Sequence, residues 1–334
     1  MSGTSPLRAW WSQRSPAAGA AVMAVGIMSI GLRLTGYEVL SGIALVLACA
    51  TWLGLAVNFA VRLLGERERW MAEAATPGAL TSVAATAVLG ARFSLLGWQP
   101  LAAVLLALSA LLWPGLLLTV VRNWQWRMPG TVFLGCVATE GLAVLAAVLA
   151  AARSSEWLAH TALVLFWLGL VIYCLALPRF DRRQVIEGAG DQWIAGGALA
   201  ISSLAGSRLL AVDDSIAYLW NDDDAGVLRY MAVALLVLDL CCWAVLVVAE
   251  AARPRLRYDE LRWATVFPMG MTAVAALSIA DVDDVPWLHD LGQALLWVSV
   301  LAGVVVAAGA VRAARDDLGG KPPRHRGIRS TGRR

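Results

Sequence analysis

Long apolar segments alternate with short polar breaks along most of this chain. Ten segments are long enough to cross about 30 Å of hydrocarbon at about 1.5 Å per residue. Glycine, proline and charged residues mark the breaks, for example at 65–70, 97–100 and Pro254. The predicted spans are 17–35, 39–62, 77–97, 100–121, 130–152, 157–177, 191–212, 227–252, 263–281 and 287–313.

The composition supports a membrane protein. Of the 334 residues, 59% are hydrophobic and only 15% are charged, with a mean hydropathy of +0.68. A soluble domain of this size does not need so much apolar surface. We therefore predict an all-α integral membrane protein with a ten-helix transport domain over 17–313. Residues 1–16 are predicted to form a cytoplasmic tail. Residues 314–334 are predicted to form a second cytoplasmic tail, which is basic and disordered. We expect this second tail to contact anionic lipid and to be too short for a nucleic-acid role.

Basic residues predict the orientation of the spans. The two tails and every second loop hold 22 of the 27 lysines and arginines. The opposite loops are acidic, as at 213–214, 222–224 and 281–284. By the positive-inside rule, both termini are predicted to be cytoplasmic in a multi-pass protein of the plasma (inner) membrane, which requires an even number of spans.

Small residues divide the spans into two sets. Spans one, three and seven carry glycine, serine or threonine just before an arginine, at 26–33, 86–92 and 202–208. Span eight has no glycine, serine or threonine between Val227 and Ala252. Small residues allow helices to approach closely or leave room for a pore, whereas large aliphatic side chains face lipid. We therefore predict five hairpins, with the odd helices forming an inner pore ring and the even helices outside.

Four arginines lie toward the outer ends of odd spans. An arginine at that depth is costly unless it faces water, protein or an anion. Arg33, Arg92 and Arg208 share a small-residue context and are predicted to attract or orient an anion. Arg153 lies at the very end of span five and is interpreted as interfacial.

Span one also carries a stripe of small residues that includes Gly26 and Ser29 and ends at Arg33. One interpretation is a pore wall with an arginine at its mouth. The other is a helix-packing seam with an arginine that extends to the interface. The same pattern of small residues before an arginine recurs on spans three and seven and favours the pore. Gly26 and Ser29 are therefore predicted to line it.

Two carboxylates lie in the middle of spans. Glu140 in span five is a candidate for proton or substrate coupling, because ionisable groups at this depth are often functional. A hydrogen bond to a neighbouring helix is the alternative and is left open. For Asp239 in span eight, an inward structural hydrogen bond is the favoured interpretation.

The sequence offers little for catalysis. The five cysteines lie in apolar runs without a CxxC pair, and the histidines do not cluster, so we expect no disulfide framework and no metal site. The loops carry no HExxH motif and no glycine-rich phosphate loop, and we expect no cofactor and no enzyme. Two alternatives stay open: a membrane enzyme acting on a lipid-linked substrate, and a non-transporting scaffold or sensor.

Three segments carry a family resemblance: 22–29, 75–92 and the ninth span from Trp263 to Gly270, with its Val-Phe-Pro step. They resemble the tellurite-resistance/dicarboxylate transporter family, which includes fungal malate and sulfite transporters and plant slow-type anion channels. The resemblance implies a homotrimer in which five odd helices of each protomer form a pore. It also implies that Phe267, beside Pro268, plugs that pore. The function expected is transport of a small anion, either dicarboxylate, sulfite or inorganic, by a channel or a proton-coupled carrier.

Overall fold

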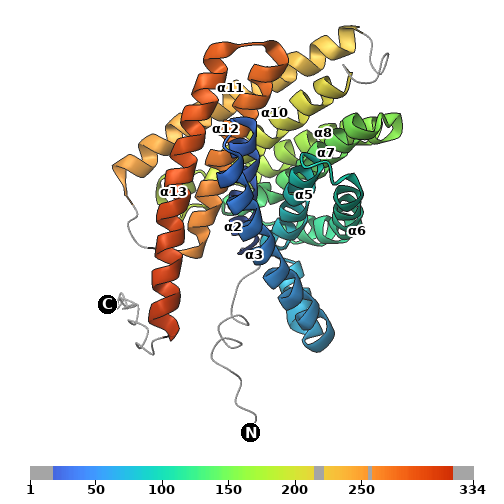
Figure 1. The fold of residues 1–334 in the computed structure, drawn as a ribbon. Coiled ribbons are helices and arrows are strands. Elements are labelled where there is room, and N and C mark those ends of the chain that lie inside the picture. The colour runs from blue at the N-terminus through green and yellow to red at the C-terminus, as the bar shows by residue number, and fades with distance from the viewer. Residues whose placement is uncertain (1–17, 214–221, 255–257, 319–334) are drawn as a thin grey trace.

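The structure is a computed structural model that describes residues 18–213, 222–254 and 258–318. Each of the ten predicted spans contains one long helix, and the described residues contain no strand (Figure 1). The long helices are α2 (Gly19–Leu34), α3 (Glu38–Gly65), α5 (Thr81–Ser94), α6 (Gln99–Arg122), α7 (Leu134–Arg153), α8 (Glu156–Ala176), α10 (Ile194–Asp213), α11 (Asp222–Ala252), α12 (Trp263–Asp283) and α13 (Pro286–Leu318). The all-α prediction is confirmed. The predicted tail 1–16, most of the tail 314–334 and residues 214–221 of an acidic loop lie outside the described residues.

Shorter elements lie between the long helices. Two are α-helical, α4 (Arg67–Ala74) and α9 (Gln184–Glu187). The others are single 3₁₀ turns. Four directly precede a long helix, namely η2 (Pro77–Leu80), η3 (Gly130–Phe133), η5 (Asp191–Trp193) and η6 (Glu260–Arg262), and η4 (Leu177–Arg179) directly follows α8.

Eight helices among the described residues are long and apolar enough to cross a membrane. The chain is therefore a membrane protein with several apolar helices. The remaining two spans are shorter, because α2 has 16 residues and α5 has 14. Ten crossings arranged as five hairpins stay a prediction.

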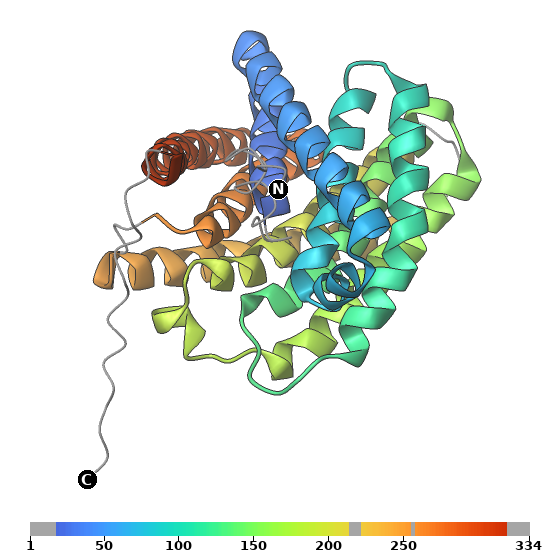
Figure 2. The ribbon, with the colours of Figure 1, turned by 90° about the horizontal axis from the view of Figure 1, so that it is seen from below.

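The long helices form two shells. Helices α2, α5, α7, α10 and α12 contact one another in that order, and α12 contacts α2, so the inner shell closes into a ring. Each inner helix also packs against the next long helix in the chain, and Figure 2 shows α13 at the edge of the bundle outside α12. The spans of α7 and α12 are 94% buried, whereas that of α3 is 17% buried. This is the division that the small-residue pattern predicts.

Glycines allow the inner helices to approach closely. A methyl group added at Gly197 of α10 would lie 2.9 Å from the ring of Pro268, and one added at Gly270 of α12 would lie 2.9 Å from Ile27. Both distances are shorter than ordinary van der Waals contact. Larger residues at these two positions would push α10 and α2 away from α12.

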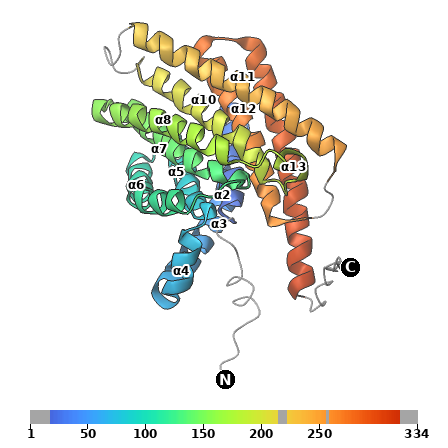
Figure 3. The same ribbon diagram turned by 180° about the vertical axis from the view of Figure 1, so that it is seen from behind.

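The hairpin of α2 and α3 turns at Gly36, whose φ of +83° is costly for other residues. The turn folds α3 back along α2. Beyond the other end of α3, helix α4 projects from the bundle, as Figures 1 and 3 show.

Candidate functional site

A small cavity of about 20 Å³ lies where the first turns of the five inner helices meet. Every inner helix, or the 3₁₀ turn just before it, contributes to its lining. Phe267 lies against this cavity and is 1% exposed. The complete lining is Ala20, Met23, Gly78, Thr81, Thr131, Leu134, Ile194, Glu260, Leu261, Ala264 and Phe267.

The direction of the five helices gives this end an electrostatic character. Because the lining comes from the starts of α2, α5, α7, α10 and α12, five helix N-termini converge on one point. The N-terminus of a helix carries a partial charge of about +0.5. The first N–H groups of α5, α7, α10 and α12 bond to carbonyls of the 3₁₀ turns before them, so the favourable charge comes from the helix dipoles rather than from free donors. The convergence therefore favours an anion over a cation at this end of the ring.

Pro268 distorts α12 directly after Phe267. Proline has no N–H, so the carbonyl of Ala264 loses its partner within the helix. On the following turn, the Thr272 hydroxyl donates to the Pro268 carbonyl oxygen at 3.0 Å. The Pro268 ring packs against Gly197, so the distortion lies within the inner ring.

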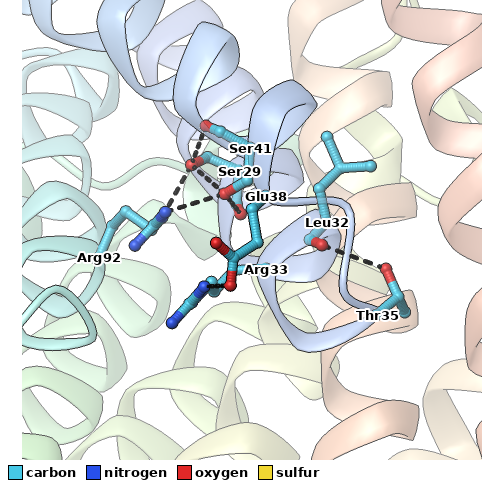
Figure 4. A network of polar contacts seen from close by, with 7 residues as sticks. All are labelled: Ser29, Leu32, Arg33, Thr35, Glu38, Ser41 and Arg92. Carbon is cyan, nitrogen blue, oxygen red and sulfur yellow. Dashed lines mark hydrogen bonds and ion pairs between the residues drawn. The ribbon is translucent and has the colours of Figure 1, made fainter.

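A second site, which is polar, lies near the C-terminal end of α5 (Figure 4). Arg92 is 2% exposed and reaches the crossing of α2 and α3. Its Nε donates to the Ser29 hydroxyl at 2.9 Å, and its Nη2 donates to the Ser41 hydroxyl at 2.9 Å. Arg92 thus joins three helices.

The hydroxyl groups of Ser29 and Ser41 use their hydrogens on backbone carbonyls. The Ser29 hydroxyl donates to the Ser41 carbonyl at 2.8 Å, and the Ser41 hydroxyl donates to the Ser29 carbonyl at 2.6 Å. Both hydroxyl oxygens are therefore left as acceptors for Arg92. Arg92 Nη1 is buried and has no hydrogen-bond partner among the described residues. The guanidinium keeps unused donors, and no ion pair of Arg92 with a carboxylate appears in the described part of the chain.

The other predicted arginines lie in different surroundings. Arg33 is part-exposed and pairs with Glu38 across the α2–α3 turn. Arg208 is half-buried on α10, close enough to Asp281 of α12 to interact with it electrostatically. Arg153 is exposed at the end of α7, which agrees with the interfacial interpretation. A uniform ring of arginines is therefore not what the structure shows.

The small-residue stripe of α2 lies along α5. A methyl group added at Gly26 would lie 2.8 Å from Val88 of α5, and Ser29 binds Arg92 and Ser41. Packing between α2 and α5 accounts for the small size of Gly26. A pore-lining role for Gly26 and Ser29 stays a prediction.

Glu140 is fully buried and lies between α7, α8 and α10. The Ser202 hydroxyl donates to its Oε1 at 3.0 Å, while Oε2 has no partner among the described residues. Its carboxyl packs against Gly169 of the outer helix α8. The neighbouring Gly141 instead lies near Ala87 of α5. The arrangement fits the hydrogen-bonding alternative, and a coupling role for Glu140 stays a prediction.

Asp239 of the outer helix α11 is 1% exposed and points inward. A methyl group added at Gly196 of α10 would lie 3.2 Å from its Oδ1, its Oδ2 has no hydrogen-bond partner among the described residues, and the Thr272 side chain of α12 lies nearby. Asp239 therefore approaches the segment that Pro268 distorts. The inward orientation agrees with the sequence-based interpretation.

Some site residues were not predicted. Ser41 is a lone serine in an apolar span, and only the α2–α3 turn reveals that it faces Ser29. Asp191 is buried, and its side chain lies close to the backbone N–H groups of Gly130 and Thr131 at the start of the α7 span, while its Oδ2 has no hydrogen-bond partner among the described residues. An aspartate at the start of a span gives a capping signal in the sequence, although it does not reveal that its carboxylate lies beside the start of another helix.

Comparison with known families fits this geometry. Residues 13–311 match the family described as voltage-dependent anion channel, SLAC1. The chain belongs to this family. Membership indicates anion transport across a membrane and fits a transport role rather than a catalytic one. No curated protein sequence matched the chain.

Proposed function

We propose that this SLAC1-family protein conducts small anions along the axis of its inner ring, with Phe267 as the gate. The observation that carries the proposal is the cavity at Phe267, lined from all five inner helices. A path along the ring axis has to pass this point. The phenylalanine occupies it as an apolar plug, and a hydrophobic constriction of this kind stops ions because they cannot shed their water there.

Charge supports an anion rather than a cation. Five helix N-termini face the Phe267 end. Arg92 lies 11 residues after Thr81 on α5, which is about 16 Å along a helix. We propose that the helix termini attract an anion at one end of the path and that Arg92, Arg33 and Arg208 orient it at the other.

The proposed setting is the plasma (inner) membrane, with ten crossings and both termini in the cytoplasm. In this orientation the Phe267 end faces the cytoplasm. The proposed assembly is a homotrimer with one path per protomer. The proposed cargo is a small dicarboxylate, sulfite or inorganic anion, and Pro268 is the point at which α12 flexes when Phe267 moves.

Replacement of the gate tests the proposal. The Phe267→Ala variant should conduct anions faster than wild type in proteoliposomes, because the plug is removed. Phe166→Ala is the matched control, since Phe166 is equally buried but lies on α8 outside the cavity. Unchanged flux in a folded, conducting Phe267→Ala protein would remove Phe267 from the gate.

A further inference from the structure

A larger cavity, of about 300 Å³, lies outside the inner ring. Helices α3, α4, α5 and α6 supply most of its lining, and Gly19 and Val22 of α2 and Ala79 of η2 complete it. The cavity is separate from the path proposed for anions, which uses the other side of α5. Neither the family description nor the proposed function assigns it a role.

The polar groups of this cavity gather toward one end. Along α3 the lining runs from Trp52 and Leu55 to Arg62, which is 7% exposed and binds Glu73 of α4 with contacts of 2.6 and 2.7 Å. Trp70 of α4 lines the same end, with its indole Nε1 enclosed by protein rather than exposed to the cavity. The far part of the cavity is lined mainly by apolar side chains, including Leu108 and Leu112 of α6.

The surroundings indicate what fills this space. Helices α3 and α6 flank the cavity, and only 17% and 22% of their spans are buried, so the neighbouring medium is lipid. Apolar walls do not hold water well, and an empty void forfeits the contacts of its lining. The occupant must therefore be apolar along most of its length, with its polar part at the end that Arg62 and Glu73 line.

We propose that the cavity is a binding site for one acyl chain of a membrane phospholipid. The chain lies along the apolar walls, with its headgroup at the end of the cavity that Arg62 and Glu73 line. Arg62 and Glu73 satisfy each other's charge at this end, so the net charge of the headgroup contributes little to binding.

The occupant would touch the outer side of the wall of the proposed anion path. Thr81 lines both the small cavity at Phe267 and this larger one. Gly19 packs directly on Thr81, with a methyl group added at Gly19 lying 2.8 Å from Thr81 Cβ. A bound chain would therefore support α5 and α2 from outside, at the level of Phe267.

Photocrosslinking tests the site directly. The whole protein is reconstituted into vesicles of phosphatidylcholine that carries a photoactivatable diazirine in one acyl chain, and the adducts are mapped by peptide mass spectrometry. The filling variant is Ser82→Leu with Ala85→Leu, since both positions line the cavity. The matched control is Ala110→Leu, because Ala110 is exposed on α6 and is not part of the lining.

The proposal expects wild-type adducts to concentrate on the lining of α3, α5 and α6 and to fall several-fold in the filling variant, with no change in Ala110→Leu. Adducts spread evenly over outward positions such as Val57 and Leu111 would overturn the proposal. So would crosslinks that place a second copy of the chain in the cavity. The readout does not depend on anion flux, so it stands apart from the gating experiment.

Discussion

Glu140 on α7 packs against Gly169 on α8, so closely that a methyl group added at Gly169 would lie 2.6 Å from the Glu140 Cδ. The missing side chain of Gly169 makes the space that the carboxyl group fills. Glu140 therefore belongs to the contact between an inner and an outer helix.

This contact predicts a coupling between the two positions. Gly169→Ala should destabilise the protein by about 1–3 kcal/mol, the usual cost of overpacking. The cost should shrink in a Glu140→Ala background, because the clashing carboxyl is absent. Thermal unfolding of the two single variants and the double variant in detergent measures the coupling energy. Strictly additive effects would show that the two side chains do not share this space.

Removal of the positive charge of Arg92 should reduce anion transport. Arg92→Gln should lower anion flux about tenfold, because the loss of roughly 1–2 kcal/mol of electrostatic attraction corresponds to such a factor. Ser29 and Ser41 keep their bonds to backbone carbonyls, so the hairpin should stay folded. The matched control is Arg153→Gln, because Arg153 is exposed, and this variant should transport anions at the wild-type rate. Equal effects of the two substitutions would remove Arg92 from the anion path.

The inward position of Asp239 predicts that two replacements differ in their effect on stability. Asp239→Asn keeps the hydrogen-bonding groups that face Thr272 and should be tolerated. Asp239→Leu removes the polar group that lies near Thr272, while Thr272 keeps its bond to the Pro268 carbonyl, so the expected cost is about 1 kcal/mol of stability. Thermal unfolding and anion flux of both variants check this. If Asp239→Asn and Asp239→Leu unfold at the same temperature and conduct equally, the polar contact of Asp239 with α12 does not stabilise the protein.

The division into inner and outer helices could be predicted from the sequence. Glycine and serine on spans one, three and seven mark helices that other helices surround, whereas the aliphatic run of span eight marks a helix beside lipid. Phe267 could be singled out only through family resemblance, since a phenylalanine beside a proline is also common in a packed core.

The direction of individual side chains could not be predicted. A helix such as α7, which is buried on all sides, has no polar face that reveals its rotation. Whether Glu140 faced the ring axis or α8 therefore depended on Gly169, a residue of another helix. Arg33 and Arg92 look alike in the sequence, but Gly36 turns the chain so that Glu38 reaches Arg33 and Ser41 reaches Arg92.

The central claim is that the side chain at position 267 closes an anion path along the inner ring. Anion flux into proteoliposomes, measured for Phe267→Ala, Phe267→Leu, wild type and Phe267→Trp at equal protein content, tests it most directly. The account predicts that flux falls as the side chain grows, with Phe267→Ala the fastest and Phe267→Trp no faster than wild type. Equal flux in all four folded proteins would contradict it.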